Sequence, residues 1–220
     1  DYSSAQEAMK GVSENESCAG FFGKSIKKEL AANKEVLFLM EKKPQLQVFD
    51  RAAAALRAAE KGYYSFSAEN IYSSLEYIAA HILKKFGVDK SSVDPGILEK
   101  KGFKVSDFIT KKGGIGLFDA FRLIARMGEE IGKKFESDKE IFAALKIRNE
   151  FIHQGKHVRK KDAERFYECA QIYYSAFLKE YGDMKESKLK KIMEKFRFIH
   201  QQKPNLNIKS LSVLLLKRKN

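Results

Sequence analysis

The stretch from Ser67 to Gly87 carries the clearest helical pattern in the chain, and it limits the folds that are open to it. Its apolar residues recur every three or four positions and would share one face of an α-helix. They are Ile71, Leu75, Ile78, Ile82 and Phe86. Ser67 can cap the start of this helix and Gly87 can end it. Because an apolar face must be buried against other elements, the stretch predicts a core-facing helix.

Similar spacings of apolar residues occur along most of the chain. They predict further helices at residues 25–40, 45–61, 117–135, 137–155, 161–181 and 184–202. Residues 88–116 contain several glycines and are predicted to form a surface connection with short helical turns at 95–101 and 106–112. No convincing alternation of strands and helices is present. The sequence therefore predicts an all-α fold, an antiparallel bundle of helices joined by short loops.

The predicted helices group into three parts. Residues 45–182 would form a helical domain, preceded by a helical extension at 1–44 and followed by a basic helix and tail at 183–220. The last part holds eleven Lys and Arg against three Asp and Glu, within a formal charge of +13 for the whole chain. Nucleic acid is the expected polyanionic partner, because the other helices have core-facing patterns. Association of the basic helix at 184–202 with an acidic membrane surface is a weaker alternative.

Cysteine usage and hydropathy bear on the cellular location. Cys18 and Cys169 are far apart and lack metal-ligand spacing, which is typical of a reduced intracellular compartment. The longest uncharged apolar run, residues 211–216, is far too short to span a bilayer. No secretory signal is recognised, although Asp1 in place of Met indicates a processed or trimmed N-terminus. We therefore expect a cytoplasmic protein without a membrane partner.

Two patterns that could bind a cofactor or a metal are incomplete. Gly23-Lys24-Ser25 resembles the end of a phosphate-binding loop, but Cys18 stands where that loop needs glycine, and no strand precedes it. His153 and His157 have a spacing that can bind zinc on a helix. Gly155 lies between them, however, and no Glu or Cys is arranged nearby. No cofactor and no metal are predicted.

The helix predicted at 137–155 has clear signals at both ends. Ser137 and Glu140 are expected to form a capping box at its start. Gly155 can take the left-handed conformation that ends a helix. The apolar face is predicted to consist of Ile141, Phe142, Leu145 and Ile152.

Arg148, Asn149 and His153 lie late in this helix and suit the cleavage of a phosphodiester. RNA carries its own nucleophile, the 2′-hydroxyl, so catalysis needs proton transfer and stabilisation of a pentavalent phosphorane. A neutral His153 can take the proton of the 2′-hydroxyl or protonate the leaving 5′-oxygen. Arg148 can hold two phosphate oxygens. Asn149, on the same helical face as His153, can orient the imidazole or a phosphate oxygen.

A basic run follows the helix directly and would attract the RNA backbone. It consists of Lys156, His157, Arg159, Lys160 and Lys161. A simpler interpretation stays open, in which His153 is an ordinary histidine at a helix end and Arg148 an ordinary surface cation.

The pattern Arg-Asn-x-x-x-His, late in a helix of an all-α domain with another helix after it, resembles the signature of HEPN domains. The resemblance covers about residues 45–182 and places the family's arginine, polar residue and histidine at Arg148, Asn149 and His153. It implies a metal-independent ribonuclease of a kind found in toxin–antitoxin, CRISPR-associated and other antiviral systems. The Tyr that follows the His in one toxin subfamily is absent, since Gln154 stands there. Members often also carry a polar or acidic residue on an earlier helix facing the site, for which the candidates are Glu69, Ser73 and Glu76.

Helix geometry favours a dimeric site. Residues five apart in a helix lie about 140° apart around its axis, so Arg148 and His153 do not share a face. The chain contains one such motif, and a second copy of it would have to come from another molecule. The resemblance to HEPN nucleases likewise implies a cleft formed by two chains.

We therefore expect an HEPN-like domain that acts as a metal-independent endoribonuclease, leaving a 2′,3′-cyclic phosphate and a 5′-hydroxyl. The expected partners are RNA, a second copy of the chain, and an antitoxin or regulatory protein. The alternative is a catalytically inactive basic helical module that binds nucleic acid or a protein partner through residues 183–220.

Overall fold

The computed structural model describes residues 45–110 and 113–181 of the 220-residue chain. In chain order its elements are α4 (Gln45–Glu60), α5 (Tyr64–Lys85), α6 (Pro95–Lys100), the 3-10 turn η1 (Val105–Asp107), α7 (Leu117–Arg126), α8 (Glu130–Ser137), α9 (Lys139–Gln154) and α10 (Lys160–Tyr181). Extended pairing in this part of the chain is limited to an isolated bridge between Ile109 and Ile115. The all-α prediction is confirmed. The helices predicted at 25–40 and 184–202 lie outside the described residues, and the domain boundaries at 44 and 182 stay predictions.

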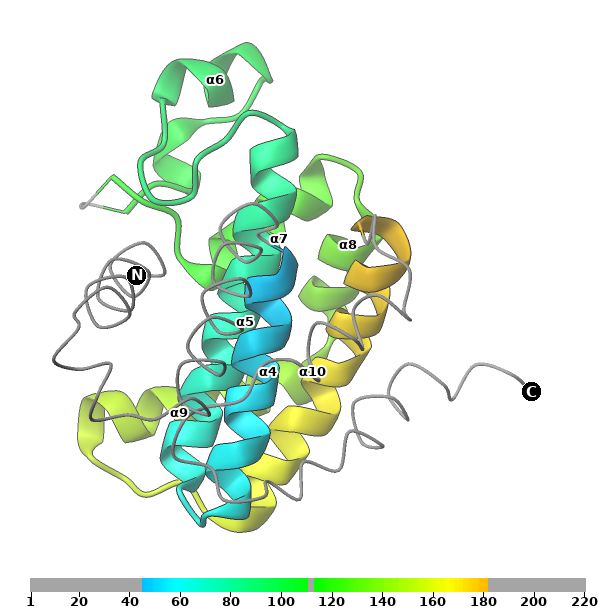
Figure 1. Cartoon of the computed structure of the whole chain (residues 1–220). Helices are drawn as coiled ribbons and strands as arrows, with labels where there is room; N and C mark the ends of the chain where they lie inside the picture. The colour runs from blue at the N-terminus through cyan, green and yellow to red at the C-terminus, as the bar shows by residue number, and fades with distance from the viewer. Residues whose placement is uncertain (1–44, 111–112, 182–220) are drawn as a thin grey trace, which may run out of the picture. The chain divides into compact units, whose positions relative to one another are not determined.

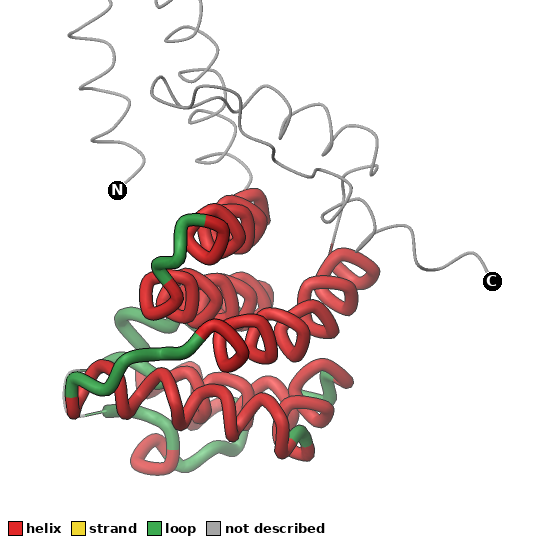
Figure 2. Tube along the Cα trace, turned by 90° about the horizontal axis from the view of Figure 1, so that it is seen from below, coloured by secondary structure: helices red, strands yellow, loops and turns green. Residues whose placement is uncertain are grey.

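Helices α5 and α10 are the longest of the described helices, and they run in the same direction (Figure 1). Near their starts, the Val158 N–H donates a hydrogen bond to Ser65 Oγ at 3.3 Å. Further along, Ser74 Oγ and Tyr174 Oη are hydrogen-bonded at 2.5 Å. Helix α4 lies beside α5 and runs in the opposite direction (Figures 1 and 2). Helix α9 contacts both α5 and α10, so these two helices determine what surrounds the motif.

The apolar face predicted for α5 is buried over Ile71, Leu75, Ile78 and Ile82. Helix α10 buries a matching face, which consists of Phe166, Ala170, Tyr173, Tyr174 and Phe177. Full burial of a large apolar side chain stabilises a fold by about 1.5–3 kcal/mol. Phe86 ends α5 and is only half-buried. Among residues 45–110 and 113–181, no helix combines the length and apolar content needed to cross a membrane.

The single helix predicted at 117–135 is in fact two helices, α7 and α8. The break falls at Gly128, whose φ of +95° is a conformation that other residues rarely adopt. It lets α8 fold back so that the Phe135 ring stacks on Phe121 with centroids 4.0 Å apart. The apolar spacing continues through Gly128, which is why the pattern alone predicted an unbroken helix.

Two predicted helix starts were wrong. Helix α5 begins at Tyr64, and Ser67 is buried inside it instead of capping it. The cap of α9 is Asp138, whose carboxylate accepts from the N–H groups of Glu140 and Ile141, both at 3.0 Å. Ser137 belongs to the end of α8, where its hydroxyl donates to backbone carbonyls of the preceding turn. Asp and Ser are both good N-cap residues, so the sequence alone could not decide which of the two caps α9.

The segment between α5 and α7 is a folded connection with its own small core. Its buried apolar residues are Val88, Leu98, Phe108 and Ile115. The guanidinium groups of Arg122 and Arg126, on α7, lie over the Phe108 ring at 5.7 and 5.3 Å. The turn predicted at 95–101 corresponds to α6, whereas the one predicted at 106–112 corresponds to the shorter η1. These contacts attach the connection to α7.

Candidate active site

Helix α9 enters the core with its first half and leaves its second half at the surface. Its last buried residue is Leu145, and none of residues 147–154 is buried. Gly155 ends the helix in the left-handed conformation, with φ +68° and its N–H donating to the Phe151 carbonyl, as predicted. Ile152, predicted on the apolar face, is 45% exposed because the last turns extend past the core. The motif residues therefore lie at the edge of the bundle.

Arg148 is held by side chains of α5. Its Nη2 donates to Glu69 Oε2 at 2.8 Å, and its Nε lies 2.6 Å from Glu69 Oε1. The guanidinium carbon lies 3.8 Å from the centroid of the Tyr72 ring. On its own helix, Arg148 Nη1 donates to Asn149 Oδ1 at 3.1 Å. One carboxylate, one ring face and one amide thus surround the guanidinium group.

These contacts leave part of Arg148 unused. A guanidinium group has five N–H donors. Glu69 lies beside two of them, although only the Nη2–H is aligned to donate to it, and Asn149 accepts from a third, so two have no such contact. The side chain of Arg148 is 14% exposed and that of Glu69 is 27% exposed, so the pair is shielded without being sealed.

The Tyr72 hydroxyl is a neutral donor at physiological pH. Burial and the neighbouring Glu76 raise the pKa of Tyr72 to about 12, while Arg148 acts in the opposite direction. Glu76 lies four residues after Tyr72 on α5, one turn away on the same helical face, so its negative charge disfavours the phenolate.

His153 lies apart from this group. It is exposed in the last turn of α9, five positions after Arg148 and so about 140° away around the helix axis. The structure brings Arg148 and Asn149 together with Glu69, but it does not bring His153 to them within one chain. The imidazole faces solvent, where a substrate or another chain can reach it.

All five residues of the basic run are exposed. Three of them face carboxylates, with Lys156 paired to Glu150 at 3.1 Å, Arg159 to Asp162 at 2.7 Å and Lys160 to Glu164 at 3.8 Å. The hydrogen bond from Arg159 holds the pKa of Asp162 below its usual range. Exposed pairs of this kind are weak, so a phosphate can replace the carboxylate. Val158, buried and bonded to Ser65, anchors the run against the start of α5.

A protein-family model described as the Csm6 HEPN domain matches residues 39–178. The match covers more than half of the chain and includes Arg148, Asn149 and His153. The chain belongs to this HEPN family. The resemblance drawn from the Arg-Asn-x-x-x-His pattern is therefore confirmed. No curated protein and no solved structure matches the chain.

Two residues of this HEPN domain join the site from α5. Among Glu69, Ser73 and Glu76, only Glu69 pairs with Arg148 in the structure, while Glu76 pairs with Lys90. Tyr72 was not predicted at all. Its spacing of three residues from Glu69 places it one turn along the same helical face, and this was the one signal in the sequence that could have indicated it.

The histidines with zinc-like spacing do not form a metal site in the HEPN domain. His153 belongs to α9, whereas His157 lies beyond Gly155 in the loop, so the two do not share a helical face. Within the described ranges, no group of three or more His, Cys, Asp or Glu is arranged to hold a metal ion.

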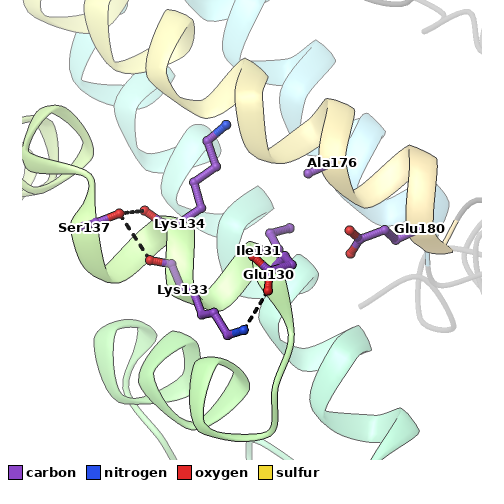
Figure 3. Close-up of a pocket in the computed structure, with 7 residues that line it drawn as sticks. All are labelled: Glu130, Ile131, Lys133, Lys134, Ser137, Ala176 and Glu180. Carbon is purple, nitrogen blue, oxygen red and sulfur yellow. Dashed lines mark hydrogen bonds and ion pairs between the residues drawn. The ribbon is translucent and has the colours of Figure 1, made fainter.

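A hollow of about 370 Å³ lies elsewhere on the domain, between α8 and the end of α10 (Figure 3). Its lining residues are Glu130, Ile131, Lys133, Lys134, Ser137, Ala176 and Glu180. Two of them, Lys133 and Glu130, form an exposed ion pair with a distance of 2.6 Å (Figure 3). No arginine or histidine lines this hollow, so it lacks the groups that suit phosphodiester cleavage.

Proposed function

We propose that this HEPN domain is a metal-independent endoribonuclease. The observation that carries the proposal is the Arg148 guanidinium, held at the surface by Glu69 with two N–H groups unused, on the same helix as an exposed His153. Arginine and histidine are the two side chains that cleavage by the 2′-hydroxyl of RNA requires. The family match supports the same assignment.

In this proposal His153 moves protons and Arg148 stabilises charge. The 2′-hydroxyl attacks the adjacent phosphorus, its proton passes to the base, and the bond to the 5′-oxygen breaks as that oxygen is protonated. His153 serves one of these two transfers, since its pKa range suits both. The free N–H groups of Arg148 bind the phosphorane oxygens as negative charge develops. The products are a 2′,3′-cyclic phosphate and a 5′-hydroxyl.

The complete site is proposed to form between two copies of the chain, one supplying Arg148 and the other His153. Exposed apolar side chains at this end of the domain support such an interface. Phe66, 63% exposed, lies one helical turn before Glu69 on α5, and Ile152, 45% exposed, is next to His153 on α9. Large apolar side chains in one region of a surface often mark a contact with another chain.

The proposal requires RNA cleavage in the presence of a chelator. The full chain, incubated with end-labelled single-stranded RNA and excess EDTA, should produce fragments that end in a 2′,3′-cyclic phosphate. A substrate with 2′-deoxy substitutions should remain intact, because it lacks the nucleophile. Tight RNA binding without any cleavage would instead favour the alternative, a catalytically inactive module that binds nucleic acid.

The substitution Glu69→Gln should slow cleavage without weakening RNA binding. Loss of the carboxylate lets the Arg148 guanidinium turn, so the single-turnover rate at saturating RNA should fall about tenfold. Affinity for a 2′-deoxy analogue should rise slightly, because a negative charge near the phosphate is gone. The matched control is Glu136→Gln, an exposed glutamate of α8. An unchanged rate would show that Glu69 does not orient Arg148 during catalysis.

A defence or toxin role in the cytoplasm, under the control of an antitoxin or regulatory protein, is the biological setting that we propose for this activity. Its support is the family description alone. The contribution of the basic segment at 183–220 to RNA binding also stays a prediction, because that segment lies outside the described residues.

A further inference from the structure

The Tyr72 ring can fix the plane of the Arg148 guanidinium group, which the Glu69 carboxylate alone cannot do. A carboxylate that is 27% exposed can swivel, and an ion pair at such a site is a weak constraint on orientation. The central carbon of the guanidinium lies over the Tyr72 ring, 3.8 Å from the ring centroid. A flat cation over an aromatic face is attracted to it and keeps its plane near that face. Together, ring and carboxylate fix both the plane and the in-plane direction of Arg148.

We propose that Tyr72 is a positioning residue for Arg148, with its ring fixing the plane of the guanidinium group while Glu69 fixes the direction within that plane. The inference rests on the proposed ribonuclease function and assigns to α5 the task of orienting the catalytic arginine. The unused N–H groups of Arg148 then point in one direction before RNA arrives, which avoids reorganisation during the reaction.

The kinetic test separates the ring from its hydroxyl in the full chain. Tyr72→Leu removes the stacked ring, and the single-turnover rate at saturating RNA should fall about ten- to a hundredfold, while affinity for a 2′-deoxy analogue changes less than about twofold. Tyr72→Phe keeps the ring, and its rate should stay within about threefold of the wild type. Equal rates for Tyr72→Leu and wild type would overturn the proposal, as would equal losses in the Leu and Phe variants.

An NMR measurement tests whether Tyr72 positions Arg148 without relying on RNA cleavage. The Nε–H signal of Arg148, assigned with Arg148→Lys, should be shifted upfield by the ring beneath it. The shift should persist in Tyr72→Phe and disappear in Tyr72→Leu. An unshifted signal in the wild type would contradict the stack. If instead the shift is present but the wild-type chain cleaves no RNA, the positioning of Arg148 stands and the proposed function fails.

Discussion

Replacing His153 by alanine should reduce RNA cleavage about a hundred- to ten-thousandfold and leave the melting temperature unchanged. The loss follows from removing the proton-transferring group. The unchanged stability follows from its position, because His153 is exposed in the last turn of α9 and supports no core contact. Single-turnover cleavage assays with EDTA present, together with thermal unfolding followed by circular dichroism, measure both effects.

Arg148→Ala should reduce activity about as much as His153→Ala does. Unlike His153→Ala, it should also lower the stability of the domain. Loss of the group that stabilises the phosphorane should cost about a hundred- to a thousandfold in rate. The change also leaves the half-buried Glu69 carboxylate without its cation and uncovers the Tyr72 ring. We expect a loss of about 1–2 kcal/mol in the free energy of unfolding, which lowers the melting temperature of a domain of this size by about 2–6 °C.

A double variant separates these two effects of Arg148. In Arg148→Ala combined with Glu69→Ala, no carboxylate is left unpaired, so part of the stability should return while cleavage stays abolished. If His153→Ala unfolds the domain, the histidine is structural. If both single alanine variants keep full activity, the ribonuclease proposal is wrong.

The parts of the fold that the sequence predicted well are those governed by a single helical face. The buried face of α5 was predicted residue by residue, because burial along one side of a long helix produces the spacing directly. The break at Gly128 was missed, because its neighbours keep the helical spacing and only the packing of Phe135 on Phe121 requires the turn. The cap of α9 was missed for a similar reason, since two adjacent residues had suitable side chains.

The site residues differ in the same way, because those within one helix could be predicted from the sequence and those on a second helix could not. Arg148, Asn149 and His153 form a pattern within one helix, so the sequence alone could indicate them. Glu69 and Tyr72 lie more than seventy residues earlier, and their role depends on how α5 packs against α9. No spacing rule within one helix predicts such a pairing. The resemblance to HEPN domains limited the acidic partner to three candidates, and the geometry selected Glu69 from them.

The last prediction is that inactive variants will restore activity to each other. A two-fold dimer has two sites, each with Arg148 from one chain and His153 from the other. When Arg148→Ala and His153→Ala chains are mixed and allowed to exchange, a mixed dimer has one site without either group and one site with both. Random exchange makes half of the dimers mixed, so activity should recover to about a quarter of the wild-type value.

The expected recovery of activity follows from the separation of Arg148 and His153 within one chain. Arg148 points toward Glu69 and Tyr72 on α5, whereas His153 faces solvent about 140° around α9. On the regular helix of one chain the two groups lie on different faces, which disfavours contact of both with one phosphate. Dilution through the range in which the dimer dissociates should accordingly lower the activity per chain. A mixture that stays inactive, together with a sedimenting monomer whose activity per chain is constant on dilution, would show that each chain builds its own site.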